Sequence, residues 1–215
     1  MAESVSTVFV VDDDPATRES LEFLFGTLDI HSKIYASAHD FLADFRSSSP
    51  GCLVCDVRMP DMSGLELLDR LAAMGTQLPV ILITAYADVP MAIREFQSGA
   101  ADFVEKPFNA QVMLERVQRI LAQDLERRAS IAEWDEFSRR MASLTEKERE
   151  ALTMLLDGQS NKFIASRLDI SERAVEMRRA SVMKTLQANS LVEMIRRVTQ
   201  FEMLFPKRKP DASSK

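Results

Sequence analysis

Short apolar segments alternate with amphipathic segments five times in roughly the first 120 residues, and this alternation constrains the fold most strongly. Three of the apolar segments, at residues 8–11, 52–55 and 80–83, have no polar residue at alternate positions. Strands have this composition when helices cover both faces of a sheet, because neither face then meets water. The pattern therefore predicts a doubly wound α/β domain built on a five-stranded parallel sheet.

The amphipathic segments repeat their apolar residues at three- and four-residue spacing, as helices do. We expect strands near residues 8–11, 34–35, 52–56, 78–85 and 101–108. We expect helices near residues 15–28, 41–45, 65–71, 91–97 and 112–121. Each strand then leads into a helix, which is the kind of connection that parallel neighbours require.

Polar and charged residues stand where the expected strands end. Asp12 and Asp13 follow the first strand, and Asp56 ends the third. Thr84 and Lys106 lie at the ends of the fourth and fifth. In such sheets the functional crevice lies at the carboxyl ends of the strands. Three carboxylates that meet there repel one another, and a divalent cation such as Mg²⁺ relieves that repulsion. A hydroxyl and an ammonium beside them suit phosphoryl oxygens, so we predict a phosphoryl-transfer site with Asp56 as the nucleophile.

Two cysteines, Cys52 and Cys55, have the C-x-x-C spacing of some redox and metal sites. Residues three apart in a strand point to opposite faces, so the two thiols would share neither a metal nor an easy disulfide. We therefore expect two buried apolar thiols.

The motifs VVDDD, CDVRMPDMSG, ILITA and DFVEKPF stand in order with these strand ends. Together they resemble a response-regulator receiver domain, which implies a flavodoxin-like (CheY-like) fold for residues 1–123. The resemblance implies that Asp56 accepts phosphate from a cognate sensor histidine kinase. It also implies a Mg²⁺ ion held by Asp13, Asp56 and the backbone carbonyl of Arg58, with Asp12 acting through water.

The same resemblance assigns Thr84 and Phe103 as a switch pair and places Lys106 against the phosphoryl group, with a cis peptide before Pro107. An alternative is a Mg²⁺-dependent phosphatase of the haloacid-dehalogenase type, in which Asp12 of the Asp12-x-Asp14 pattern would be the nucleophile. That hypothesis leaves the motif around Asp56 unexplained. Asp14 itself is expected to lie in a solvated turn.

Charge divides the chain into two parts. Residues 1–137 hold 11 Lys/Arg and 23 Asp/Glu, whereas residues 138–215 hold 16 and 10. The basic part predicts an anionic partner. Its segments LTEKEREAL, DGQSNKFIASRLDIS and AVEMRRASVMKTL resemble the LuxR-type helix-turn-helix of the NarL/FixJ response regulators. DVPMAI at residues 88–93 and a linker ending in RRMASLT are similar to the FixJ-like subfamily.

In a helix-turn-helix the second helix enters the major groove, and here that helix is expected to start near Ser171. Basic side chains on it favour phosphates: Arg173, Arg178, Arg179 and Lys184. The start of the preceding helix favours a phosphate too: Ser160, Asn161 and Lys162. The resemblance implies that three residues face bases: Glu176, Met177 and Ala180. The family usually has His where Arg178 stands and Thr where Ala174 stands, so the bases contacted and the operator sequence are not predicted. A second departure is Ala85-Tyr86, where the subfamily commonly has Gly-His.

The expected organisation is a receiver at 1–123, a helical linker at 124–142, the DNA-binding domain at 143–205 and a disordered tail at 206–215. The expected core positions of the second domain are Ile164, Leu168, Val175, Val182 and Leu186. The final helix is expected to pair DNA-bound protomers through Leu191, Met194, Ile195 and Val198.

The resemblance implies a homodimer on phosphorylation, with double-stranded DNA and RNA polymerase as further partners. No apolar run approaches the ~20 residues of a membrane span, and the first residues lack the pattern of a signal peptide. We therefore expect a cytoplasmic regulator without a membrane partner. Apart from assisting its own phosphoryl transfer and dephosphorylation, the protein is not expected to be an enzyme.

Overall fold

The computed structural model describes residues 5–85 and 99–205, which form two compact units. One unit ends at Ala129 and the other begins at Ser130. Within the described ranges, no helix is both long enough and apolar enough to cross a membrane. The expected boundary at residue 123 stays a prediction.

Several sequence-based expectations lie outside the described residues. They concern the helix near 91–97, the subfamily segment at 88–93, Tyr86 and the tail at 206–215.

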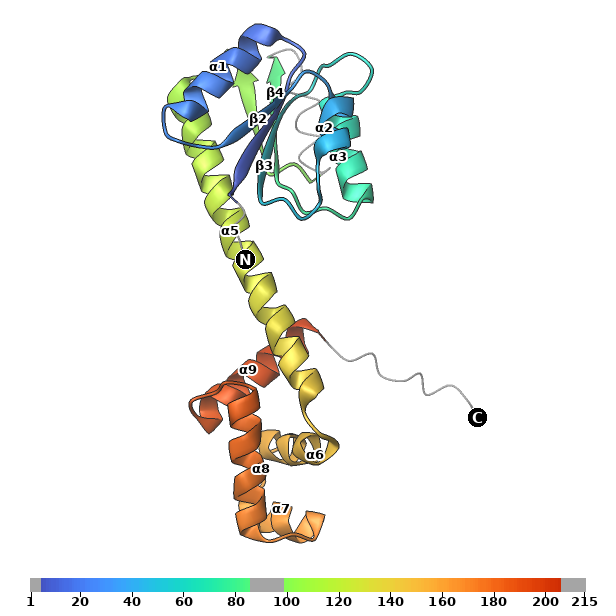
Figure 1. The fold of residues 1–215 in the computed structure, drawn as a ribbon, viewed down its shortest axis with the longest axis vertical. Helices are drawn as coiled ribbons and strands as arrows, with labels where there is room; N and C mark the ends of the chain where they lie inside the picture. The colour runs from blue at the N-terminus through green and yellow to red at the C-terminus, as the bar shows by residue number, and fades with distance from the viewer. Residues whose placement is uncertain (1–4, 86–98, 206–215) are drawn as a thin grey trace, which may run out of the picture. The chain divides into compact units, whose positions relative to one another are not determined.

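The first unit is built on a parallel sheet of five strands (Figure 1). The strands are β1 (Thr7–Val11), β2 (Ser32–Tyr35), β3 (Gly51–Asp56), β4 (Val80–Ala85) and β5 (Asp102–Lys106). Their order is β2-β1-β3-β4-β5, and every neighbouring pair is parallel. The chain therefore winds outward in both directions from β1 and β3, as the alternation of segments predicted. The switch point of a doubly wound sheet lies between these two central strands.

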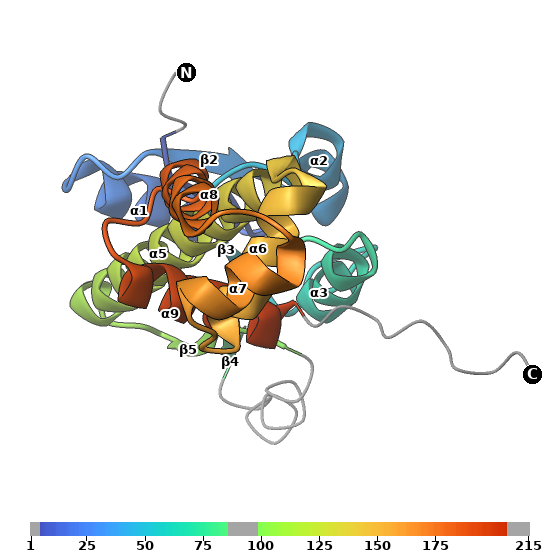
Figure 2. The same ribbon diagram turned by 90° about the horizontal axis from the view of Figure 1, so that it is seen from below.

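Helices cover both faces of this sheet. They are α1 (Pro15–Gly26), α2 (Ala38–Asp44), α3 (Gly64–Ala73) and α5 (Ala110–Ser143). Figures 1 and 2 show α1 and α5 on one face and α2 and α3 on the other. Cys52 packs in the core beneath α1 and α5, and Cys55 packs in the core beneath α2 and α3. The prediction of two buried thiols on opposite faces is confirmed, and burial raises the pKa of Cys52 to about 12.

The second unit joins residues 130–143 of α5 to four further helices. These are α6 (Glu146–Leu156), α7 (Asn161–Leu168), α8 (Glu172–Thr185) and α9 (Leu191–Leu204). Each of the four follows a Ser or Thr whose side-chain oxygen accepts from a backbone N–H of the first turn. Four of the expected core residues are buried and Leu168 packs against the same core, so the predicted core of this unit is confirmed.

The prediction that the final helix pairs DNA-bound protomers is wrong for two of its four apolar residues. Met194 and Val198 on α9 are 0% exposed and belong to the core of their own unit, together with Phe137 of α5. The spacing of apolar residues shows that a helix has an apolar face but does not say what covers it. Here the end of α5 and the other helices of the unit cover that face.

In the first unit, two apolar residues that fit the helical spacing are exposed in the structure. Leu28 lies beyond the end of α1 and is 47% exposed, because the chain leaves the helix after Gly26. Val112 lies on α5 but is 40% exposed, so the apolar pattern of this helix is wider than its buried face. The residues expected to form a helical linker continue α5 without a break.

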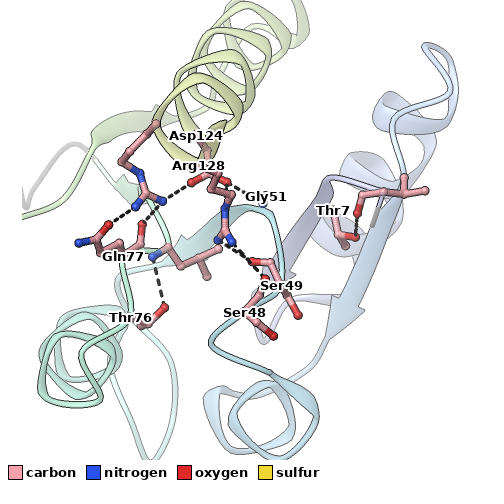
Figure 3. A network of polar contacts seen from close by, with 11 residues as sticks. Thr7, Ser48, Ser49, Gly51, Thr76, Gln77, Asp124 and Arg128 are labelled. Carbon is pink, nitrogen blue, oxygen red and sulfur yellow. Dashed lines mark hydrogen bonds and ion pairs between the residues drawn. The ribbon is translucent and has the colours of Figure 1, made fainter. Parts of the chain in front are cut away.

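A buried carboxylate ties α5 to the amino-terminal edge of the sheet (Figure 3). Asp124 is 3% exposed, and its Oδ2 accepts from the Gly51 N–H at 3.1 Å and from Arg128 Nε at 2.6 Å. Arg127 also pairs with Asp124 and donates to the Gln77 carbonyl at 3.0 Å. Arg128 reaches the carbonyls that precede β3. The turns of α5 that end the first unit are therefore held by residues far away in the sequence.

Gly51 has a φ of 137°, in the region that favours glycine. A Cβ at this position would lie 1.8 Å from the Thr7 carbonyl oxygen. The start of β3 therefore approaches β1 too closely to leave room for a side chain at Gly51. The Gly51 N–H donates to Asp124.

Candidate functional site

The strand pairing brings the predicted carboxylates together. Val11 pairs with Cys55, so the residues that follow them, Asp12 and Asp56, leave neighbouring strands side by side. Asp13 is the next residue of the same loop. One carboxylate oxygen from each of the three aspartates lies within 4.8 Å of the other two. The sequence-based grouping of these side chains at the carboxyl edge of the sheet is thus what the structure shows.

Lys106, at the end of β5, reaches across this edge to two of the carboxylates. Its Nζ lies 2.8 Å from Asp12 Oδ2 and 3.2 Å from Asp56 Oδ1. Burial opposes the charge of Lys106, but the bond to Asp12 and the charge of Asp56 outweigh it and raise the pKa of the ammonium. The lysine therefore stays protonated and partly balances the acidic group.

Burial raises the pKa of the Asp56 carboxyl, and the Lys106 ammonium opposes this effect. The negative charges of Asp12 and Asp13 add to the rise. An ionised carboxylate in this environment is stabilised when a cation approaches, because the added positive charge offsets both the repulsion between carboxylates and the lost hydration. The site therefore favours binding of a divalent cation.

The three aspartates differ in how their oxygens are used. Asp12 is 1% exposed, and its two carboxylate oxygens accept from the Asp14 N–H at 2.9 Å and from Lys106 Nζ at 2.8 Å. Asp13 is exposed. Asp56 is 8% exposed. A nucleophile needs a reachable oxygen, so Asp12 suits this role poorly and the phosphatase alternative loses its central residue.

The predicted switch residues lie on the two strands beside this group. Thr84 is buried at 1% exposure near the end of β4 and pairs with Glu105 of β5, one residue before Lys106. Phe103, two residues earlier on β5, is 37% exposed. The Lys106-Pro107 peptide is cis, as the resemblance implied. A hollow of about 520 Å³ opens beside this peptide and the start of α1.

Two residues of the site were missed in the sequence. Asp14 is exposed as expected, but it also caps α1: its carboxylate accepts from the N–H groups of Ala16 and Thr17, both at 3.2 Å. The signal was present, because Asp directly before a Pro at the first helical position is a typical helix start. Arg18 of α1 donates from Nη1 to the Asp12 carbonyl at 2.7 Å, and no sequence motif pointed to it.

The second unit brings together predicted DNA-contacting residues from two helices. Asn161 of α7 and Glu176, Arg179 and Ala180 of α8 line one hollow of about 260 Å³, together with Met183. The other predicted contacts lie at the start of α7 and along α8 and are exposed or partly buried: Ser160, Lys162, Arg173, Met177, Arg178 and Lys184. The hollow and its basic surroundings form one candidate DNA interface.

A hydrogen bond fixes α8 against α6 within this unit. Glu148 completes a capping box with Thr145, and its other oxygen accepts from Ser181 Oγ at 2.6 Å. The bond from Ser181 is the main cause that lowers the pKa of the Glu148 carboxyl. The helix that carries the predicted base contacts is therefore held by a polar bond as well as by the core.

Comparison with known proteins supports both units. Residues 8–118 match the family described as response regulator receiver domain, and residues 142–198 match bacterial regulatory proteins, luxR family. The chain is 39% identical to the transcriptional regulatory protein FixJ of Bradyrhizobium diazoefficiens over 197 residues, covering 92% of this chain and 96% of the relative. It is 40% identical to the C4-dicarboxylate transport transcriptional regulatory protein DctR of Rhodobacter capsulatus, covering 88% and 98%.

Two solved response-regulator structures are similar to this chain over most of its length. The response regulator StyR matches with a TM-score of 0.83 at 37% identity, covering 91% of this chain and 98% of that one. Full-length FixJ from B. japonicum matches with a TM-score of 0.58 at 38% identity, covering 92% and 98%.

Proposed function

The chain belongs to the FixJ-like response regulators of two-component systems, and on this basis we propose that a cognate sensor histidine kinase phosphorylates it on Asp56. The protein regulates transcription in a phosphorylation-dependent manner, and its luxR-type unit binds DNA. One observation carries the proposal for Asp56. One carboxylate oxygen from each of three aspartates lies within 4.8 Å of the other two, an ammonium contacts two of these side chains, and Asp56 is the one that ends a strand, β3.

In the proposed transfer, a carboxylate oxygen of Asp56 attacks the phosphorus of a phosphohistidine on the kinase. The new P–O bond forms as the P–N bond to the histidine breaks. Lys106 Nζ, at 3.2 Å from Asp56 Oδ1, is placed to bind an oxygen of the incoming phosphoryl group. Thr84 and Phe103 are assigned to respond to that group, and their positions on β4 and β5 support this role.

The oxygen donors of the acidic group fit Mg²⁺, which prefers carboxylates and carbonyls and retains waters for a substrate. Asp13 and Asp56 would hold the ion with the backbone carbonyl of Arg58. Asp12 would act through water, in keeping with the engagement of both its carboxylate oxygens. When bound, the ion supplies positive charge to the phosphoryl oxygens during transfer.

Footprinting on promoter DNA in Mg²⁺, with and without acetyl phosphate as a small phosphodonor, tests the whole proposal. Phosphodonor should lower the protein concentration that gives half protection of a defined site. The DNA-binding unit would work independently of the receiver if protection were the same in both samples. RNA polymerase is the further partner that this proposal implies.

Phosphorylation should also promote a homodimer through the receiver. Phe103 on the edge strand β5 is 37% exposed, so a change at the site has an apolar side chain at the surface to act through. Sedimentation velocity of the Mg²⁺-bound protein should show a dimer at tens of micromolar only with acetyl phosphate. Asp56→Asn protein should stay monomeric in both samples. An unchanged wild-type monomer would mean that activation acts only through the DNA-binding unit.

Arg179→Ala and Glu176→Ala should weaken DNA binding in different ways. We assign Arg179 to phosphates, so its loss should weaken specific and random DNA alike and reduce the salt slope by about 0.9. We assign Glu176 to a base, so its loss should cost about 1–3 kcal/mol on the preferred base pair and leave the salt slope nearly unchanged. Both residues line the same hollow on α8, which makes them a matched pair.

Binding measured against specific and random duplexes at several salt concentrations separates the two roles. Equal losses on every sequence with identical slopes would contradict the assignment. In that case Arg178, which replaces the usual histidine of the family, is the next residue to test.

A further inference from the structure

Arg18 is the fourth residue of α1 and does not belong to the group of carboxylates and the lysine described above. Its Nη1 donates to the backbone carbonyl of Asp12 at 2.7 Å, and its side chain is only partly exposed. The acceptor belongs to the peptide group that joins Asp12 to Asp13. Arg18 therefore contacts the backbone between two of the three carboxylate-bearing residues.

The polar atoms of Asp12 all have partners in the structure. The N–H donates to the Tyr35 carbonyl at 3.3 Å, and the carboxylate oxygens accept from Asp14 and Lys106. The carbonyl accepts from Arg18. A residue held at every polar atom has a fixed orientation, and the plane of the peptide that follows it is fixed as well.

That peptide plane limits where the Asp13 side chain can lie. The Asp12 carbonyl and the Asp13 N–H lie in one plane because the peptide bond is rigid. A bond that holds the carbonyl therefore limits the directions open to the Asp13 side chain. Asp13 is exposed, and one of its carboxylate oxygens nevertheless lies within 4.8 Å of an oxygen of Asp56.

We propose that Arg18 is a positioning residue that holds the Asp12–Asp13 peptide so that the Asp13 carboxylate is ready to receive Mg²⁺. The inference rests on the proposed function, which assigns Mg²⁺ to Asp13 and Asp56. Residues one step removed from a metal commonly act in this way, by orienting the side chains that bind it.

The charge of Arg18 and its hydrogen bond have opposite effects on Mg²⁺. A guanidinium near the site repels a dication, so its removal would tighten Mg²⁺ binding if charge were its only contribution. The bond to the carbonyl orders the loop, so its removal would weaken binding if positioning dominates. The direction of the change therefore distinguishes the two roles.

The test is calorimetric titration of the unphosphorylated full chain with Mg²⁺. Arg18→Met, which removes both the bond and the charge, should raise the dissociation constant about 10-fold. Arg18→Lys, which retains a donor and the charge, should restore binding to within about 2-fold of wild type. Arg46→Met is the matched control, because Arg46 is exposed and follows α2 at the opposite edge of the sheet. It should bind Mg²⁺ as wild type does.

Labelling by acetyl phosphate gives a second readout. Arg18→Met should need about 10-fold more Mg²⁺ for half-maximal labelling, in line with its dissociation constant, yet reach the wild-type rate at saturation. A structural defect would instead lower the maximal rate and the melting temperature.

Unchanged or tighter Mg²⁺ binding in Arg18→Met would overturn the role of Arg18, whatever happens to labelling. The proposed function has its own test in the same series, because Asp13→Asn must weaken Mg²⁺ binding. If Asp13→Asn binds Mg²⁺ as wild type does, the assignment of the ion fails before Arg18 is considered.

Discussion

Asp56→Asn should abolish labelling by acetyl phosphate while the protein stays folded. The amide has nearly the same shape as the carboxylate, but its oxygen is a poor nucleophile and cannot form the acyl phosphate. The pKa of Asp56 is raised by burial, so a neutral side chain at this position also removes the cost of holding a charge there. The fold should therefore tolerate the change.

Labelling with radioactive acetyl phosphate, followed by circular dichroism of the same samples, measures both expectations. Asp12→Asn is the informative control, because Asp12 was the nucleophile in the phosphatase alternative. It should slow labelling without abolishing it, and removal of Mg²⁺ with a chelator should block labelling of the wild type. Persistent labelling of Asp56→Asn, together with its loss in Asp12→Asn, would reverse the assignment.

Asp124→Ala should destabilise the first unit by about 3 kcal/mol. The carboxylate is 3% exposed and pairs with Arg127 and Arg128, so its removal leaves two partly buried guanidinium groups without their main partner. It also leaves the buried Gly51 N–H without an acceptor. Loss of one partner of a buried network costs far more than loss of an exposed ion pair, because the remaining groups stay dehydrated.

Urea unfolding of the full chain, followed by far-ultraviolet circular dichroism, measures this loss. Trp134 packs against the core of the second unit, so its fluorescence should report unfolding of that unit, whose urea midpoint should shift less. Glu126→Ala is the matched control on the same helix, because Glu126 is exposed, and it should change stability by no more than about 0.5 kcal/mol. If both variants unfold at the same urea concentration, the network does not hold α5 to the sheet.

The class of the first unit and the location of its chemistry could both be predicted from local residue patterns. Helix and strand periods are local properties, so uninterrupted apolar segments were enough to predict a sheet buried on both faces. Strands that run parallel end at the same edge, and this rule alone predicts that Asp12, Asp56 and Lys106 lie close together. The opposite faces of Cys52 and Cys55 followed from the two-residue period of a strand.

Features that depend on contacts between distant residues could be seen only in the folded chain. Gly51 and Asp124 bond across 73 positions, and no periodicity links them. The spacing on α9 revealed an apolar face, but only the packing showed that Met194 and Val198 face the core of their own unit. The bond from Arg18 to Asp12 was invisible because its acceptor is a backbone carbonyl, which every residue carries. Local patterns state which groups need a partner, and the folded chain selects the partner through distances that a linear sequence does not contain.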